Sequence, residues 1–501
     1  MQKMTKGTNL ETDDFNELVA NCEKEALHLS GQIQGFGGAF FIDNESLTVT
    51  AASENIAEYC PLSVAQLVGT KVHDLTWLPL ELLYNLGIKA GNRAYAFNDN
   101  TTTASLNYRS HRSDAGILIE IERSTATVTQ RQYLQLRASI LPRIDASWQE
   151  HDYWNQLIHT LDEFLPCERI VLYRFNEHWS GEVVAEKVVT GLPPYLGLKF
   201  PASDIPAIAR QMYYQNPSRY IADSRQEAVN FLTQYGTPLD LTYSDLRSVS
   251  PLHGEYLQNM GVATSFSVPI MQTGKLWGII SCHHATATPI DAHLRYQAES
   301  LVKYFSMIYS TYQSKKRLAL LTSLDDEVSV LAQKLRIKGE QSIPSFLQAA
   351  KTAFQASGAA MYINDDWHLC LPKAEQRLVR DIDNACRHDT SDVLLSKQDI
   401  RDVDGLASVS HEEVRGVMLI RLNFELKSLR LYVFRQPEKQ ITHWAGNPDK
   451  TMQKVNSHGV LSPRASFEKW SEVDGEQSLP WSKRDLLLAK KLRAALIRLL
   501  T

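Results

Sequence analysis

The sequence contains no long apolar run and no excess of basic residues. A membrane-spanning helix needs about 20 consecutive, mostly apolar residues, and neither such a run nor the apolar centre of a secretory signal occurs. The 52 Lys and Arg residues are outnumbered by 57 Asp and Glu residues, which leaves a formal net charge of -5. Proteins that bind nucleic acid or acidic membranes through bulk charge carry a basic surface. We therefore expect a cytoplasmic protein with no membrane and no nucleic acid among its partners.

Paired cysteines and common catalytic motifs are also missing. The six cysteines include no Cys-x-x-Cys pair and show no regular spacing, which disfavours a disulfide framework and a structural zinc site. No Gly-x-Ser-x-Gly, Gly-x-x-x-x-Gly-Lys or Gly-x-Gly-x-x-Gly motif supports a hydrolase, nucleotide-binding or dinucleotide-binding protein. His283 and His284 are adjacent on a predicted strand, so their side chains point to opposite faces and cannot share a metal ion. We assign no catalytic residue and no metal ligand.

The length of 501 residues predicts about three domains. The first is expected to contain an antiparallel sheet, because short apolar segments alternate with turn residues. Its predicted strands are residues 35–43, 47–52, 93–97 and 116–122, and its predicted helical segments are residues 55–68 and 78–86. A helical pattern that starts near residue 130 marks the beginning of the second domain.

The second domain contains the clearest hairpin of the chain. Its predicted strands are residues 169–175, 182–189, 265–271 and 275–283, of which the last two form the hairpin. Ser265 and Ser267 share one face of their strand, since successive side chains point to opposite faces. Ser281 and His283 share one face of the return strand in the same way. If the two polar faces coincide, they line a binding site; an ordinary solvent-facing side of the sheet explains the pattern equally well.

A long amphipathic helix is predicted from residue 291. Apolar residues recur at spacings of 4, 3, 4, 3 and 4, namely Leu294, Ala298, Leu301, Phe305, Ile308 and Tyr312. The pattern continues towards Leu335. Such a helix joins two domains and offers a seam to a second copy of the chain, which predicts a homodimer. Burial of the stripe against the chain's own domains is the equally good alternative.

The third domain repeats the plan of the second. Its predicted elements are a helix near residues 344–356, a strand at 359–363 and a hairpin formed by 416–422 and 429–435. Residues 436–481 then lead to a final helix, a connection far longer than the roughly 12 to 15 residues of ordinary unstructured loops. This segment is either a functional arm or disordered. Large aromatic side chains argue against disorder, and the segment contains Trp444, Phe467, Trp470 and Trp481.

Four motifs occur in order along the second and third domains. They are PASDIP at residues 201–206, LRSVSPLHGEYLQNMGV at 246–262, SCHH at 281–284 and PRASF at 463–467. Each is weak alone, but together they resemble the photosensory core of the bacterial phytochromes, and the resemblance spans nearly the whole chain. It implies an α+β fold of three consecutive domains, PAS, GAF and PHY. Each would be an antiparallel sheet with flanking helices, and long helices would join the domains.

The resemblance also implies domain positions and a function. It places a PAS domain at residues 1–125, a GAF domain at 126–315 and a PHY domain at 316–501. A PHY tongue at about 436–481 would extend to the GAF pocket. The chain would be a red/far-red photoreceptor and a sensory module, not an enzyme, that holds an open-chain tetrapyrrole. A histidine kinase or diguanylate cyclase output domain would lie beyond Thr501.

The residues that match the family's pocket have expected roles. The resemblance assigns the two propionates to Arg219 and Arg247, since charge-assisted contacts from Arg are strong. The hydroxyls that would assist them belong to Tyr213, Ser250, Ser265 and Ser267. The pyrrole nitrogens would donate to the backbone carbonyl of Asp204, within the stretch that includes Ile205 and Pro206, and to a water held near His253.

The terminal D ring of the pigment needs a partner that tolerates its rotation. The resemblance gives this role to His283, which would donate to the ring carbonyl. The aromatic residues expected around the ring are Tyr173, Phe200 and Tyr256. Aromatic walls permit turning without a hydrogen-bond penalty.

The attachment point separates the subfamilies. Plant and cyanobacterial phytochromes attach the pigment to the cysteine just before the pocket histidine, but Leu252 precedes His253 here. Bacterial members use a cysteine near the N-terminus, and Cys22 occupies that place. The resemblance therefore implies biliverdin linked by a thioether to Cys22, which would otherwise be an unremarkable thiol. Cys282 is next to two histidines, but its strand parity directs it away from His283 and into the core.

One stretch departs from the family pattern. Many relatives have Ile-Gln-Pro-His-Gly after the cysteine segment, whereas residues 33–37 read Ile-Gln-Gly-Phe-Gly. The resemblance therefore does not determine the local backbone geometry at the point where the N-terminal segment is expected to pass through a GAF loop with Ile33 inside it.

The resemblance also implies a signalling mechanism. Light would isomerise the C15=C16 double bond and turn ring D, the tongue would refold from hairpin to helix, and Asp204 would exchange Arg464 for Ser466. Two other classes stay open. A GAF-type regulatory module that binds a cyclic nucleotide or another small molecule would fit the fold and the missing catalytic motifs. A light-independent dimerisation scaffold would fit the helix stripes but not the segment 436–481.

Overall fold

The chain folds into two compact units, residues 1–310 with 443–470 and residues 311–442 with 471–501. Cys22, Pro463 and most of the helical pattern predicted between residues 130 and 147 lie outside the described residues. The structure, a computed structural model, describes residues 26–500 except 98–105, 126–134, 136–137, 139–146, 235, 237, 337–341, 364, 372–375, 387–392, 408–413, 424–427, 449–463 and 475–476.

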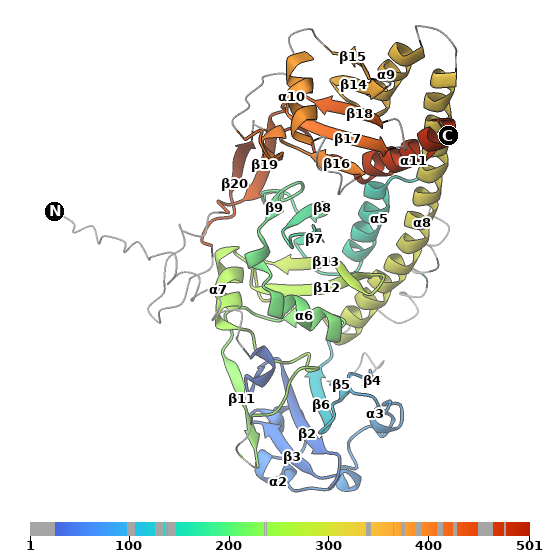
Figure 1. The fold of residues 1–501 in the computed structure, drawn as a ribbon. Helices are drawn as coiled ribbons and strands as arrows, with labels where there is room; N and C mark the ends of the chain where they lie inside the picture. The colour runs from blue at the N-terminus through green and yellow to red at the C-terminus, as the bar shows by residue number, and fades with distance from the viewer. Residues whose placement is uncertain are drawn as a thin grey trace, which may run out of the picture. The chain divides into compact units, whose positions relative to one another are not determined.

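The first unit begins with the predicted antiparallel sheet. Its strands are β1 Gln32–Gln34, β2 Gly37–Asp43, β3 Val49–Ser53, β4 Arg93–Ala96, β5 Leu106–Arg112, β6 Gly116–Arg123 and β11 Ala228–Thr233. They follow the order β1-β11-β3-β2-β6-β5-β4, so β11, from a much later part of the chain, lies between β1 and β3. Figure 1 shows β11 beside β3. Alternate residues of β2 and β6, such as Phe40 and Ile119, fill the core beside short helical turns. These turns are η1 Leu27–Leu29, η2 Ile56–Glu58, α2 Val64–Leu67, η3 Val72–Asp74 and α3 Glu81–Tyr84.

Strand β5 was not predicted from the sequence. Its residues read LNYRSHR, and the face that carries Asn107, Arg109 and His111 is hydrophilic, which is untypical of a covered strand. All three side chains are nevertheless buried, because charged groups from other strands surround them. The helical segments predicted at 55–68 and 78–86 occur as separate short turns instead of continuous helices.

The second sheet carries the predicted hairpin. Its strands are β7 Arg169–Phe175, β8 Gly181–Val188, β9 Lys199–Phe200, β10 Arg219–Ile221, β12 Thr264–Gln272 and β13 Lys275–His284, in the order β10-β12-β13-β7-β8-β9. Thr273 and Gly274 connect β12 to β13 with φ angles of 49° and 76°. Two consecutive positive φ values are typical of the tight turn that matches the twist of a hairpin.

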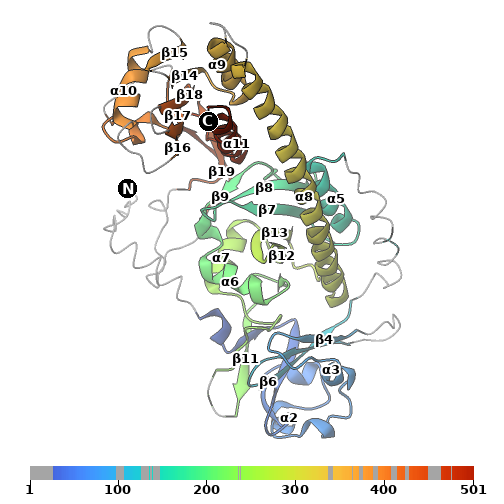
Figure 2. The same cartoon turned by 45° about the vertical axis from the view of Figure 1, so that its right-hand side comes forward.

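Helices flank the second sheet. They are α5 Glu150–Asp162, η5 Ala202–Asp204, α6 Ala207–Gln215 and α7 Pro251–Asn259, followed by the long helix α8 Ala292–Arg336 (Figures 1 and 2). Trp154 of α5 stacks on Trp277 with 4.9 Å between ring centroids, and Tyr153 donates a hydrogen bond to the carbonyl of Phe305. Residues of the predicted stripe from Leu294 to Phe305 are buried. This half of the stripe therefore packs against its own unit.

The second unit contains a five-stranded sheet of order β15-β14-β18-β17-β16. The strands are β14 Gly358–Ile363, β15 Asp366–Cys370, β16 Leu394–Lys397, β17 Gly416–Asn423 and β18 Ser428–Arg435, which confirms the predicted strand and hairpin. Its helices are α9 Ser342–Ala353, α10 Gln376–Cys386, η7 Ile400–Asp402 and α11 Lys483–Leu500. Apolar residues of α9, α11 and the end of α8 cover one face of the sheet, and α10 covers the other. The segment predicted to be either a functional arm or disordered contains β19 Gln440–Ala445 and β20 Lys469–Asp474, which follow β9 in the strand order of the second sheet. Within the described residues, no helix is long and apolar enough to cross a membrane.

Candidate functional site

The polar faces of β12 and β13 coincide. Ser265 lies directly opposite His283, and Ser267 lies opposite Ser281, so the four side chains project from the same face of the hairpin. That face borders a cavity instead of the outer surface. Cys282 projects from the other face and is fully buried, as its strand parity predicted.

The cavity lies between this face of the sheet and the segments that carry α6 and α7. Its volume is about 340 Å³, which is within the usual range of small-molecule sites. All of the described side chains that sequence analysis assigned to the pocket line it, together with Arg464. They are Tyr173, Phe200, Asp204, Ile205, Pro206, Tyr213, Arg219, Arg247, Ser250, His253, Tyr256, Ser265, Ser267 and His283. Ser466 is exposed and does not border the cavity.

Two arginines form one side of the cavity. Arg219, on β10, donates from Nη2 to the carbonyls of Arg247 and Ser248 at 2.8 and 2.9 Å, and its Nη1 is buried without a partner among the residues that the structure describes. Arg247 is 5% exposed and donates to the carbonyl of Thr242 at 3.2 Å. Among the described residues, no carboxylate lies within ion-pair distance of either guanidinium.

This arginine pair is electrostatically unbalanced. Burial lowers the pKa of Arg219 to about 10. Burial and the nearby charge of Arg219 lower the pKa of Arg247 to about 9. A buried cation without a counter-charge is costly. Beside the pair, the hydroxyls of Tyr213 and Ser267 are 2.7 Å apart. An anionic ligand with hydrogen-bond acceptors would complete this side of the cavity.

Asp204 forms an ion pair with Arg464 at the edge of the cavity. The Arg464 guanidinium donates to Oδ2 of Asp204 and to the carbonyl of Ala445, and both charged side chains are at most 6% exposed. The Tyr256 hydroxyl donates to the same carboxylate oxygen at 2.9 Å. Burial raises the pKa of Tyr256 well above its usual value, so its hydroxyl keeps its proton.

The tongue contributes more than Arg464 to this part of the site. Phe467 packs edge-on against Tyr256 with 5.2 Å between ring centroids, and Asn259 of α7 donates to the carbonyl of Arg464 at 3.1 Å. Trp444 of β19 pairs with Lys199 of β9. The described tongue residues Trp444, Arg464 and Phe467 therefore contact the cavity-bearing sheet and helix α7 directly.

His283 and His253 face the cavity from two sides. Burial, with the charge of Arg169, lowers the pKa of His283 to about 3, and its Nδ1 has no partner. Burial, with the charge of Arg219, lowers the pKa of His253 to about 4, although much of its surface is open to the cavity itself. Both imidazoles are therefore neutral near pH 7, and each can donate one hydrogen bond and accept one.

The departing stretch at residues 33–37 fits its surroundings closely. Ile33 is fully buried between β11 and the segment before α7, and its β1 strand pairs with β11 in antiparallel register. Gln34 donates to the carbonyl of Tyr220 at 2.9 Å. Phe36 occupies the position of the missing histidine and packs edge-on against Tyr220. A Cβ at Gly37 would lie 2.8 Å from the Leu246 side chain, so only glycine fits there.

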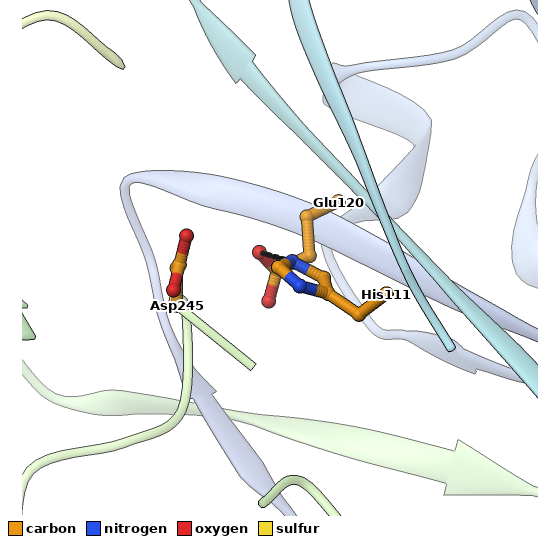
Figure 3. A group of neighbouring side chains, drawn as sticks. All are labelled: His111, Glu120 and Asp245. Carbon is orange, nitrogen blue, oxygen red and sulfur yellow. Dashed lines mark hydrogen bonds and ion pairs between the residues drawn. The ribbon is translucent and has the colours of Figure 1, made fainter. Parts of the chain in front are cut away.

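A second group of titratable residues lies where the first sheet meets the loop before α7. His111, Glu120 and Asp245 offer ligand atoms within 4.8 Å of one another (Figure 3). Asp245 is already paired with Arg93 at 2.7 Å and with Arg109 at 3.0 Å, and these arginines hold the pKa of its carboxyl far below the usual range. The two guanidiniums occupy the place of a cation, so this group joins the domains through ion pairs and we infer no metal.

Sequence analysis missed several residues of the cavity. Val171, Val183, Tyr195 and Met212 line it, but they belong to none of the four motifs. The only available signal was strand alternation in 169–175 and 182–189, which places Val171 on the same face as Tyr173. Tyr195 lies in the loop between β8 and β9, where no strand or helix periodicity predicts which way a side chain points. Cys22 lies outside the described residues, so its attachment role stays a prediction.

The three sheets of the described residues, the 45-residue helix α8 and a ligand-sized cavity define a multidomain α+β protein with a candidate binding site. Residues 22–124 match the family described as PAS fold, residues 150–308 match the GAF domain and residues 331–501 match the phytochrome region. The chain belongs to the phytochrome family and forms its PAS-GAF-PHY photosensory core.

Individual relatives agree with this assignment. The chain is 31% identical to a bacteriophytochrome of Pseudomonas aeruginosa over 96% of its own length and 66% of that protein. It is 30% identical to cyanobacterial phytochrome B of Nostoc sp., covering 97% of the chain and 67% of that protein. The chain thus spans about two thirds of the length of these relatives.

Solved structures show the same fold. The bacteriophytochrome from the photosynthetic bacterium R. palustris superposes with a TM-score of 0.81 at 23% identity, covering 96% of this chain and 99% of that one. The phytochrome photosensory core module of Stigmatella aurantiaca superposes with a TM-score of 0.75 at 25% identity, covering 96% and 98%. These structures confirm the predicted three-domain architecture.

Proposed function

We propose that this chain is a red/far-red photoreceptor module that holds biliverdin through a thioether to Cys22. The observation that carries the proposal is the pair Arg219 and Arg247, one half-buried and one buried cation that line the cavity with no carboxylate within ion-pair distance among the described residues. An open-chain tetrapyrrole carries two propionates, which match two guanidiniums. Strand face, helix α7 and arginine pair together favour a long ligand that is anionic on one side.

The chain's residues would bind such a ligand along its length. Tyr213 and Ser267, already hydrogen-bonded to each other, would turn their hydroxyls to the propionates, as would Ser250 and Ser265. The backbone carbonyl of Asp204 would accept from the pyrrole nitrogens, beside Ile205 and Pro206. A neutral His253 would hold a water that accepts from the remaining nitrogens, since an unpaired buried donor is costly.

At the other end of the cavity, the residues would allow the terminal ring to turn. When bound, biliverdin supplies the photochemistry, an isomerisation of its C15=C16 double bond by light. His283 is neutral and would donate one hydrogen bond to the ring carbonyl. The hydroxyls of Tyr173 and Tyr256 are already donated to Phe200 and Asp204, so these side chains would present apolar ring faces to the ligand.

Signal transmission would start at the ion pair between Asp204 and Arg464. Tyr256 and Arg464 both donate to Oδ2 of Asp204. A pigment ring that moves beside Tyr256 would therefore weaken or strengthen the contact between Asp204 and Arg464. In the proposed second state the tongue, residues 436–481, refolds and Asp204 binds Ser466 instead. The change would pass through α8 to a C-terminal output domain, a histidine kinase or diguanylate cyclase, in a homodimer joined by long helices.

The test is to mix the purified chain with biliverdin and record spectra before and after red light. We expect a bound pigment with a red band that shifts reversibly to the far red. Binding of a cyclic nucleotide with no coloured adduct would support a small-molecule regulatory module instead. A chain that binds neither ligand but dimerises would support a scaffold.

A further inference from the structure

Arg169 and Glu186 form a buried ion pair just behind the cavity wall. Arg169 begins β7 and Glu186 lies on β8, and their side chains are 6% and 3% exposed. Nη1 of Arg169 lies 2.5 Å from Oε1 of Glu186. Neither residue borders the cavity, and neither has a role in the function proposed above. A buried pair is weak as a source of stability, because desolvation offsets its attraction.

The pair holds the loop between β8 and β9 from both sides. Nη2 of Arg169 donates to the carbonyl of Pro193 at 2.7 Å. Oε2 of Glu186 accepts from the backbone N–H groups of Tyr195 and Leu196, each at 2.8 Å. Besides pairing with each other, the two side chains therefore hydrogen-bond to the backbone of residues 193–196.

The loop presents one aromatic ring to the cavity. The guanidinium carbon of Arg169 lies 3.7 Å from the centroid of the Tyr195 ring, a cation–π contact. Tyr195 is 7% exposed, lines the cavity and lies 5.8 Å from the Phe200 ring. Arg169 is also directly opposite His283 in the register of β7 and β13. The pair thus supports the end of the cavity where His283 lies.

We propose that Arg169 and Glu186 are positioning residues that fix the Tyr195 ring as a wall at the His283 end of the cavity. That wall restricts how far the end of a bound ligand can turn. The restriction of ligand turning rests on the proposed function, whereas the fixed position of the loop does not. Lys could not replace Arg169, because only a planar guanidinium can pair with Glu186, donate to Pro193 and cover the ring at once.

The first test measures amide hydrogen exchange in the pigment-free chain. Arg169→Lys should speed exchange of the Tyr195 and Leu196 amides by about tenfold, because Glu186 no longer holds the loop in register. The matched control is Arg174→Lys, which changes the exposed pair between Arg174 and Glu182 on the same two strands. The control should leave both amides unchanged. If Arg169→Lys does not fold, Glu186→Gln is expected to give the same faster exchange.

The second test follows light-driven change in the pigment-loaded chain. Arg169→Lys should bind pigment to the wild-type level but alter the photoconverted fraction by about twofold, because the ring wall is loosened. Tyr195→Leu should alter the photoconverted fraction by a similar factor, and adding Arg169→Lys to Tyr195→Leu should cause no further change in that fraction, since the arginine acts through the tyrosine.

Each outcome decides the proposal. Unchanged amide exchange in both Arg169→Lys and Glu186→Gln would overturn it, as would additive effects of Arg169→Lys and Tyr195→Leu. Unaltered photoconversion in Arg169→Lys would overturn the role in ligand turning. If the wild-type chain takes up no pigment, the proposed function fails, and the exchange experiment still decides whether the pair fixes Tyr195.

Discussion

Arg464 and Asp204 are hydrogen-bonded to each other although 260 residues separate them in the chain. Their contact joins the tongue to the edge of the cavity at Asp204, which belongs to the motif PASDIP. Tyr256 donates to the same carboxylate, and Phe467 packs on Tyr256. One carboxylate is thus shared by the cavity wall and the tongue, and the proposed function makes it the point at which a change in the cavity would reach the tongue.

Arg464→Ala tests this link. The variant removes the Arg464 cation from the buried Asp204 carboxylate, and loss of one partner of a buried pair costs about 3 to 5 kcal/mol locally. We expect weaker light-driven spectral change with full pigment attachment, measured by absorbance and by denaturing gels. Lys469→Ala removes an exposed tongue cation and serves as the control. Loss of covalent attachment in Arg464→Ala would contradict the interpretation.

Arg247→Met should separate stability from ligand binding. The guanidinium is buried with only backbone carbonyl partners, so its removal should leave the thermal midpoint of the pigment-free chain unchanged or higher. Pigment affinity should fall by roughly tenfold or more, since a charge-assisted contact is worth about 1.5 to 3 kcal/mol. Titration with biliverdin measures the affinity, and Arg225→Met, on the surface, is the control. Equal loss of both properties would show that Arg247 is mainly structural.

Cys22→Ser tests the attachment. A hydroxyl cannot form the thioether, but the cavity contacts stay, so pigment should still bind and denaturant should extract it. Zinc-induced fluorescence of the denatured chain distinguishes bound from extracted pigment. Cys370→Ser, in the second unit, should keep the covalent link. Covalent pigment in Cys22→Ser would place the attachment elsewhere.

Glu299→Gln should change the pH dependence of stability. Burial raises the pKa of Glu299, which accepts a hydrogen bond from Ser218. The stability this group contributes is therefore fully present below its unfolded pKa of about 4.3 and is lost as pH rises through the raised folded pKa. Gln keeps the acceptor and cannot ionise. The variant should match the wild type near pH 4.5 and exceed it near pH 8, by about 1.4 kcal/mol for each unit of the shift.

Thermal midpoints between about pH 4.5 and pH 8 measure this difference. Glu163→Gln replaces an exposed carboxylate and should run parallel to the wild type. If the difference in thermal midpoint between Glu299→Gln and the wild type does not widen as pH rises, ionisation of Glu299 in the folded protein costs no stability.

Asp245→Asn should destabilise the contact between the first sheet and the loop before α7. Arg93 and Arg109 both pair with this carboxylate and are almost fully buried, so they would be left without full compensation. We expect a loss of about 3 to 5 kcal/mol in the free energy of unfolding of the first unit. Asp114→Asn, at an exposed turn, is the control. A small loss in the variant, together with stabilisation of the wild-type chain by added zinc that the variant lacks, would favour a metal at His111, Glu120 and Asp245.

Much of the fold was predictable from local patterns. The alternation in residues 265–283 predicted the hairpin, and the 4-3-4-3 spacing after residue 291 predicted α8, because period-two and period-3.6 burial leave direct marks on sequence. Strand β5 was missed, since its buried face carries Asn107, Arg109 and His111, whose partners come from other strands and from the loops before α7 and α8.

The sequence by itself determined which residue types are available for the site. It contains the four motifs, and its strand parity placed Ser265, Ser267 and Ser281 on the same faces as the structure does. Only the tertiary structure decided that these faces meet at one cavity, that Arg219 and Arg247 lack a carboxylate within the described residues, and that Arg169 reaches Tyr195. Such facts depend on distances between segments far apart in the chain, and local periodicity carries no information about them.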